Sequence, residues 1–247
     1  MFDTYAEIFA ERARSYHSAM EAFPGARSAE FRGVLEPLDD LPDGTLCDMP
    51  AGGGYLAHHL RAGLDYIGVD PASDFVALGS KATSRIIRAH PAHVPLEAGS
   101  VDYVVSLAGL HHEPDLGSVF REMRRLIRPV GRVVIADVAS GTPPARFLNE
   151  FVDRTNPMGH DGHFLDAGTA PLLEAAGLRI LADELVFAPW VFTDIEEAAS
   201  FAGQLFGTVR APGAEVADAL SNDIGFTVEP QKAILNWSLR RIVCSRD

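Results

Sequence analysis

Two acidic residues follow short apolar runs near a glycine-rich segment. Asp48 ends the first run, and Gly52-Gly53-Gly54 comes shortly after it. Asp70 ends the next apolar run along the chain. Glycine lets the backbone approach a ligand closely, and a carboxylate that ends the neighbouring strand suits the hydroxyls of a ribose. The spacing therefore predicts a site for a nucleoside cofactor, and the identity of that cofactor decides the function.

Histidines gather at two other places. His111 and His112 follow the fourth apolar run, and His160 and His163 flank Asp161 in a polar loop. Histidine is the natural base near neutral pH, so His111, His112 and His160 are the candidate catalytic residues. A metal site made of His160, His163 and Asp161 is the less favoured alternative, because such loop residues are more often solvated or turn-forming. We therefore predict no metal.

Strands and helices must position these residues. Apolar, β-branched runs alternate with helical patterns, which predicts a parallel sheet covered on both faces. The predicted strands in the first part of the chain are Thr45–Met49, Tyr66–Asp70, Ser84–Ala89, Val101–Leu107 and Arg132–Val138. Apolar residues repeat at helical spacing from Leu116 to Ile127, and Pro129-Val130-Gly131 is expected to end that helix and start the next strand.

The pattern loosens after the fifth predicted strand. We expect a helix from Thr142 to about Thr155, a polar loop over Asn156–Phe164 and a helix over Asp166–Ala176 that Asp166 caps. The remaining extended runs are Leu178–Ala188 and Trp237–Cys244. The predicted fold is thus α/β: a Rossmann-like doubly wound sheet of about seven strands, mostly parallel with an antiparallel C-terminal strand, plus a helical lid.

Two segments are expected to form the lid. Residues 1–40 are predicted to be an N-terminal helical lid, and residues 194–234 a helical insertion over the site of a second substrate. Residues 41–193 and 235–247 would then form the Rossmann-like core. The same apolar patterns also fit ordinary core helices.

Composition narrows the range of partners and locations. The chain has 247 residues, 47% of them hydrophobic, and a net charge of -13, so nucleic acid is not expected as a partner. The two cysteines, Cys47 and Cys244, lie in apolar runs, which favours a reducing compartment and a cytoplasmic location. No run is long enough to span a membrane, and Met1–Thr4 does not begin a secretion signal. We expect a monomer or homodimer.

Two cofactors compete for the glycine segment. Gly52–Ala57 satisfies the G-x-G-x-x-G/A pattern of dinucleotide-binding proteins, which favours NAD. Asp48, however, would place a negative charge beside the pyrophosphate of NAD. A cationic sulfonium with an amino-acid tail is compatible with that carboxylate.

Five motifs carry a resemblance to a known family. Asp48–Gly54 resembles D/E-x-G-x-G-x-G, and Asp70 resembles the acidic residue that binds the cofactor ribose. Val94–Asp102, Ser106–Asp115 and Arg125–Arg132 are similar to L-P-F-x-x-x-S-F-D, S-x-x-x-L-H-H-x-x-D and R-x-L-x-P-G-G. In their order and spacing, across about residues 45–138, these motifs resemble class I S-adenosylmethionine-dependent methyltransferases of the small-molecule, ubiquinone/menaquinone-methyltransferase-like group.

The resemblance implies a cofactor and its binding residues. S-adenosyl-L-methionine would be the methyl donor and S-adenosyl-L-homocysteine the product. The implied cofactor-binding residues are Asp48, Pro50, Ala51, Gly52, Gly54, Asp70, Pro71, His90, Ser106 and Leu107. Two of them depart from the family pattern. Pro50 replaces a glycine, which removes a backbone donor, and His90 stands where many relatives place an aspartate that accepts from the adenine amino group.

The expected reaction is in-line methyl transfer to oxygen or nitrogen of a small, aromatic or heterocyclic acceptor. Candidate acceptor-binding residues are Tyr5, Tyr16, His17, His111, His160, His163 and Trp190. The aromatic ones could instead pack the lid onto the sheet. Arg12 and Arg14 are candidates to contact an anionic acceptor. Two other functions remain open, an NAD-dependent oxidoreductase and a non-catalytic S-adenosylmethionine-binding protein.

Overall fold

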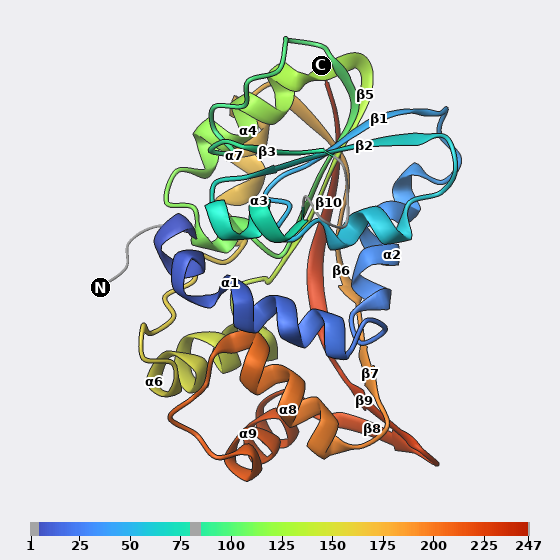
Figure 1. The fold of residues 1–247 in the computed structure, drawn as a ribbon. Coiled ribbons are helices and arrows are strands. Elements are labelled where there is room, and N and C mark those ends of the chain that lie inside the picture. The colour runs from blue at the N-terminus through green and yellow to red at the C-terminus, as the bar shows by residue number, and fades with distance from the viewer. Residues whose placement is uncertain (1–4, 80–84, 247) are drawn as a thin grey trace.

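A seven-stranded sheet forms the centre of the molecule (Figure 1). The computed structural model describes residues 5–79 and 85–246, so the predictions for Met1–Thr4 and for Ser84 lie outside the described residues. The strands of this sheet are β1 Gly44–Asp48, β2 Leu64–Asp70, β3 Ile86–Arg88, β4 Val101–Leu107, β5 Ile127–Asp137, β6 Leu178–Phe187 and β10 Ser238–Arg246. Their order is β3-β2-β1-β4-β5-β10-β6.

The pairing confirms the predicted sheet. The pairs among β1 to β5 are parallel, and β10 is antiparallel to both of its neighbours. The strand order reverses between β1 and β4, because the chain first adds β2 and β3 on one side and then β4 and β5 on the other. Open α/β sheets bind ligands beyond the carboxyl ends of the strands at this point. Asp48 and Leu107 end the two strands there.

Helices cover both faces of the sheet. The α-helices of the described residues are α1 Tyr5–Ala22, α2 Ser28–Leu35, α3 Ser73–Gly79, α4 Leu116–Leu126, α5 Pro143–Arg146, α6 Asp153–Thr155, α7 Thr169–Ala175, α8 Ile195–Phe206 and α9 Gly213–Ala219, of which α2, α3, α4 and α7 contact the strands of this sheet. Successive residues of a strand point to opposite faces. Leu46 and Val105 accordingly pack in the apolar cluster that includes α2 and α8, whereas Cys47 and Val104 pack in the cluster with α4 and α7. Burial on both faces explains why the strands read as continuous apolar runs.

Short helical turns complete the chain. They are the 3-10 turns η1 Glu36–Leu38, η2 Tyr55–His59 and η3 Leu110–His112, and the π-helical turns η4 Phe147–Val152 and η5 Leu220–Ile224. Because η4 joins α5 to α6, the helix predicted from Thr142 to Thr155 is confirmed as Pro143–Thr155.

Two boundaries were predicted wrongly. β5 begins at Ile127, which already pairs with Val101, and Pro129-Val130-Gly131 lies inside the strand at a register shift instead of starting it. This segment bulges outward, since Val130 is 82% exposed.

Helix α7 begins at Thr169, and the side chain of Asp166 accepts from the N–H of Gly168 (2.8 Å). Asp166 therefore closes the preceding turn and does not cap the helix.

A second sheet lies beside the insertion. It contains β7 Trp190–Phe192, β8 Phe226–Glu229 and β9 Lys232–Leu235, all antiparallel, in the order β7-β9-β8. The segment 194–234 therefore holds α8, α9 and most of a hairpin. Helix α1 contacts both α3 and α8, and Figure 1 shows it between the large sheet and the lower group of α6, α8 and α9.

Within the described residues, no helix is both long and apolar enough to cross a membrane. Cys47 and Cys244 are buried as free thiols.

Candidate functional site

The glycine segment forms a tight loop at the end of β1. The Met49–Pro50 peptide bond is cis, and Gly52 and Gly54 have φ angles of 55° and 76°. Glycine adopts this left-handed region without the steric cost that other residues incur. The N–H of Ala51 donates to the carbonyl of Val69 in β2 (2.9 Å). The loop is thus held across the carboxyl ends of β1 and β2.

Asp70 connects this loop to the N-terminal helix. Its carboxyl group is fully buried at the end of β2. Oδ2 accepts from the N–H of Gly52 (2.7 Å) and from the hydroxyl of Tyr5 (3.0 Å), and Oδ1 accepts from the N–H of Ala72 (2.8 Å). Burial raises the pKa of Asp70 to about 7, although these hydrogen bonds act in the opposite direction.

Asp48 is a second buried carboxyl group in the same place. Its Oδ2 accepts from the hydroxyl of Tyr66 (2.9 Å). Burial raises the pKa of Asp48 to about 8, and the charge of Asp70 raises it further. A cation bound nearby would favour the ionised form of both carboxyl groups.

A first cavity, of about 50 Å³, opens at these residues. Its lining includes Asp48, Pro50, Ala51, Gly52 and Leu107 near the strand ends, Tyr5 and Phe9 from α1, and Phe75 from α3. The ring of Phe9 packs against those of Tyr5 and Phe75, with centroids 4.5 and 4.8 Å apart. Helix α1 therefore fills much of the space above the glycine loop.

Gly54, Pro71, Ser106 and His90, which were also assigned to the cofactor, are not among the residues that line this cavity. Gly54 precedes η2, Pro71 follows β2 directly, and Ser106 is buried in β4. His90 is engaged elsewhere, since its Nδ1 accepts from the N–H of Ala92 (3.1 Å) and its Nε2 lies 3.4 Å from a carboxyl oxygen of Glu113. His90 thus has no ring nitrogen free to accept from a ligand.

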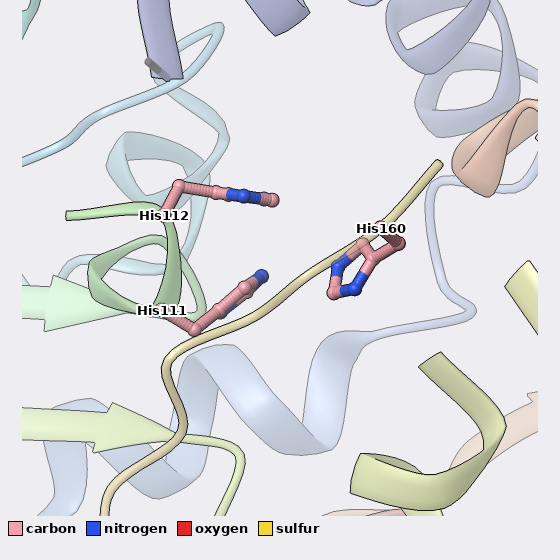
Figure 2. A group of neighbouring side chains, drawn as sticks. All are labelled: His111, His112 and His160. Atoms are coloured by element: carbon pink, nitrogen blue, oxygen red, sulfur yellow. The ribbon is translucent and has the colours of Figure 1, made fainter. Parts of the chain in front are cut away.

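Three histidines converge beside the glycine loop (Figure 2). His111 and His112 come from η3, which follows β4, and His160 comes from the loop after α6. One ring nitrogen of each lies within 4.8 Å of the corresponding nitrogens of the other two. We call His111, His112 and His160 the histidine group.

Two polar side chains orient the histidine group. Asp137, buried at the end of β5, places its Oδ1 2.7 Å from Nδ1 of His111. Asn149 in η4 places its Oδ1 2.9 Å from Nδ1 of His160. The N–H of His163 donates to the carbonyl of His111 (2.8 Å), which ties the loop to η3. Since Nδ1 is occupied in His111 and His160, Nε2 of each is left for a ligand or a proton.

Sequence reasoning missed both orienting residues. An acidic residue at the carboxyl end of the fifth strand was a usable signal for Asp137. Asn149 lies within a helical pattern and carried no such signal.

Two of the three histidines have pKa values that favour the neutral imidazole. Burial lowers the pKa of His112 and of His160 well below its usual range, and the charges of neighbouring histidines and of Arg12 act in the same direction. A neutral imidazole carries one nitrogen lone pair that can accept a proton or bind a metal ion.

A second cavity, of about 530 Å³, adjoins the histidine group. Its lining includes Arg12, His112, Asn149, Asp153, His160, Asp161 and His163. The side chains of Asp161 and His163 are exposed, so they lie at the outer part of this cavity. A guanidinium nitrogen of Arg12 donates to the carbonyl of Leu205 (2.6 Å), which links α1 to α8 above the cavity.

The aromatic candidates for acceptor binding differ in their surroundings: some pack against other side chains, and some border a cavity. Trp190 is 2% exposed, and its Nε1 donates to Glu30 (2.7 Å). It nevertheless borders a third cavity, of about 50 Å³, together with Tyr16 and the histidine group. Among the described residues His17 lines none of these three cavities; its Nδ1 lies 2.9 Å from the hydroxyl of Tyr55. Arg14 is exposed on α1.

Comparison with known proteins points to one family. Residues 47–135 match the family model described as a methyltransferase domain. An uncharacterized methyltransferase from Mycobacterium sp. (strain JLS) is 34% identical over 151 residues, which are 53% of this chain and 60% of that protein. The chain thus spans less than two thirds of this curated relative.

Solved structures show the same fold at low sequence identity. A SAM-dependent methyltransferase from Thermotoga maritima superposes with a TM-score of 0.65 and 14% identity, covering 97% of this chain and 99% of that one. The geranyl diphosphate C-methyltransferase of Streptomyces coelicolor, solved with Mg²⁺, geranyl diphosphate and S-adenosyl-L-homocysteine, gives 0.62 and 16%, covering 94% and 84%.

Proposed function

We propose that this chain, whose residues 47–135 match the methyltransferase-domain model, is an S-adenosylmethionine-dependent methyltransferase that acts on oxygen or nitrogen of a small acceptor. One observation carries this proposal. The glycine loop with Asp70 and the histidine group lie next to each other at the point where the strand order reverses. This arrangement offers one site for a nucleoside cofactor and an adjoining site for an acceptor.

In this proposal the cofactor lies across the ends of β1 and β2. The carboxylate of Asp70 accepts from the ribose hydroxyls, and the loop from Asp48 to Gly54 holds the methionine part. The charge of Asp48 favours the cationic sulfonium and amino group. Pro50, Ala51, Pro71, Ser106 and Leu107 contribute the walls, whereas the engaged ring of His90 leaves the adenine to other groups. The Streptomyces relative, whose structure holds S-adenosyl-L-homocysteine, supports this choice of cofactor.

The acceptor lies in the second cavity in this proposal. Its nucleophilic oxygen or nitrogen attacks the methyl carbon in line with the sulfur. The new bond to carbon forms as the S–CH₃ bond breaks, and the sulfonium becomes a neutral thioether. The proton of the acceptor passes to Nε2 of His111, because Asp137 holds Nδ1–H and stabilises the imidazolium. Burial of the histidine group and closure by α1 exclude water.

The residues around the acceptor favour a planar organic molecule. Tyr16 and Trp190 border the third cavity, which shares Arg12, His112 and His160 with the second, and Arg12 supplies a positive charge to both. Aromatic walls suit an aromatic or heterocyclic acceptor. The free, buried cysteines fit a cytoplasmic location, and we propose a monomer or homodimer that acts without nucleic acid.

An acceptor panel tests the proposed activity. Purified protein is incubated with S-adenosylmethionine and a set of phenols, heterocycles and amines, and release of S-adenosylhomocysteine is measured. We expect release with at least one acceptor and less of it in His111→Gln. Tight binding of S-adenosylhomocysteine without turnover of any acceptor would instead favour a non-catalytic binding protein.

The affinity for S-adenosylhomocysteine is expected to rise with pH. Binding to ribose and amino groups requires the ionised carboxylates, so the pKa values of Asp70 and Asp48, about 7 and 8 in the free protein, must fall on binding. Protons are then released on binding, and affinity increases until the pH exceeds the free pKa values. Calorimetric titrations at pH 6 and 8.5 are expected to differ at least tenfold in Kd. A pH-independent Kd would contradict this assignment of the carboxylates.

Tyr5→Phe is expected to tighten S-adenosylhomocysteine binding. The Tyr5 hydroxyl occupies Oδ2 of Asp70, the atom proposed to bind ribose, so the cofactor must displace it. Removing this hydroxyl is expected to improve Kd by roughly 3- to 10-fold, since a net hydrogen bond is worth about 0.5–1.5 kcal/mol. Tyr16→Phe is the matched control, because the Tyr16 hydroxyl accepts from Arg27, whereas the Tyr5 hydroxyl donates to Asp70. Weaker binding by Tyr5→Phe would mean that this hydroxyl contacts the cofactor.

A further inference from the structure

We propose that the histidine group, His111, His112 and His160, binds a divalent transition-metal ion such as Zn²⁺. These three residues were predicted from the sequence as catalytic candidates and not as metal ligands. The sequence pattern joined His160 to His163 and Asp161, whereas the fold brings it to His111 and His112 (Figure 2). Imidazole nitrogen is a preferred ligand for Zn²⁺ and its first-row neighbours, and Mg²⁺ and Ca²⁺ prefer oxygen. The chemistry of this ligand set therefore selects the transition metals.

The hydrogen bonds behind the rings are those that metal-binding histidines require. A ligating histidine usually donates its other N–H to a carboxylate or a carbonyl oxygen, which fixes the tautomer and the orientation of the ring. Asp137 serves His111 in this way at 2.7 Å, and the amide oxygen of Asn149 serves His160 at 2.9 Å. Both rings therefore present an unprotonated Nε2. Two independent parts of the fold, the end of β5 and η4, supply these supports.

Two charged side chains near the group bear on how it would hold an ion. The buried carboxylate of Asp137 lies behind His111 and offsets part of the charge of the ion. The positive charge of Arg12, which lines the second cavity, repels the ion and therefore favours an anionic ligand in the remaining coordination positions.

The spacing allows coordination after a small movement. Zn–N distances of about 2.0–2.1 Å place tetrahedral ligand atoms about 3.3 Å apart. The three nitrogens lie within 4.8 Å of one another, so the rings must approach by at most about 1.5 Å. The second cavity borders His112 and His160, so these two rings have open space beside them. The same cavity gives the acceptor access to the open coordination positions.

This inference adds to the proposed methyltransferase and rests on it for the role of the ion. A metal-bound hydroxyl group of the acceptor loses its proton at lower pH, so the ion would prepare the nucleophile. The lone pair on Nε2 of His111 cannot both bind the ion and accept a proton. The ion would thus take over the role of His111 by lowering the pKa of the acceptor hydroxyl, and the proton would pass to solvent water at the second cavity.

Metal titration of the untagged, chelator-treated protein tests the site directly. We expect one Zn²⁺ per chain by calorimetry and one Co²⁺ with visible absorption bands typical of nitrogen ligands. His160→Ala is expected to weaken Zn²⁺ binding at least 100-fold, and Asn149→Ala about 10-fold because it frees the ring. His163→Ala is the matched control, a histidine of the same loop and cavity outside the group, and is expected to keep the wild-type Zn²⁺ affinity.

Three results would overturn the inference. They are the absence of stoichiometric Zn²⁺ binding by the wild type, unchanged affinity in His160→Ala, and an equal loss in His163→Ala. Circular dichroism and titration with S-adenosylhomocysteine show whether each variant is folded. These measurements also separate the two proposals. A protein that lacks the metal site is still expected to bind S-adenosylhomocysteine. If the protein does not bind S-adenosylhomocysteine, the Zn²⁺ titration still tests the metal site.

Discussion

Asp70→Asn is expected to weaken binding of S-adenosylhomocysteine by about 100-fold. The wild-type carboxylate is buried at the end of β2, where it can accept charge-assisted hydrogen bonds from two ribose hydroxyls. Such bonds are worth about 1.5–3 kcal/mol, and about 2.7 kcal/mol corresponds to a factor of 100 in Kd. Asparagine keeps the size of the side chain but presents an N–H₂ group where Gly52 and Ala72 already donate. The variant therefore loses both the charge and the acceptor geometry.

Asp65→Asn is the matched control for Asp70→Asn. Asp65 lies in the same strand but is exposed at its opposite end, so the Kd is expected to stay at the wild-type value. Calorimetric titration measures both variants, and thermal unfolding reports their stability. If Asp70→Asn is folded and binds S-adenosylhomocysteine as the wild type does, Asp70 is not the ribose-binding residue.

Arg27→Ala is expected to lower the free energy of unfolding by about 3–5 kcal/mol. Arg27 and Glu30 form an ion pair at 2.5 Å with side-chain exposures of 6% and 0%. Glu30 also accepts from Nε1 of Trp190 and so joins α2 to β7. Removal of the arginine leaves a buried carboxyl group without its charge partner, and breaking buried pairs typically costs this much. Urea unfolding followed by fluorescence measures the change.

Two variants make this stability prediction specific. The double variant Arg27→Met, Glu30→Gln removes both charges and is expected to recover part of the loss, because no buried charge is then left unpaired. Glu215→Ala breaks an exposed ion pair with Arg154 (3.7 Å) and is expected to cost at most about 1 kcal/mol. Equal effects of Arg27→Ala and Glu215→Ala would show that the buried pair does not hold the lid to the core.

The sheet could be predicted because its information is local. Each of β1, β2 and β4 contains a short apolar stretch that is buried, namely Leu46–Cys47, Ile67–Val69 and Tyr103–Val105, and burial on both faces requires such stretches. The start of β5 could not be found in this way. Ile127 completes the helical repeat of α4 and also pairs with Val101, so one residue satisfies both patterns. The hairpin of β8 and β9 escaped detection because β8 is mostly exposed and each strand has only four residues.

In the candidate site, too, only the residues whose relation is local in sequence could be predicted. Asp48, the glycine loop and Asp70 are readable because spacing along the chain fixes their relation to two neighbouring strands. The partners of His160 are not readable, because His111 and Asn149 reach it only through packing of the loop against η3 and η4. Nearness in sequence therefore favoured His163 and Asp161, which the fold leaves exposed at the outer part of the cavity.

The central claim is that the loop after β1 and the carboxylate that ends β2 bind S-adenosylmethionine. Parallel calorimetric titrations of the wild-type protein with S-adenosylhomocysteine and with NADH test this claim most directly. We predict binding of one S-adenosylhomocysteine per chain and no heat of binding for NADH. Binding of NADH without binding of S-adenosylhomocysteine would contradict the claim and would identify the site as that of an oxidoreductase.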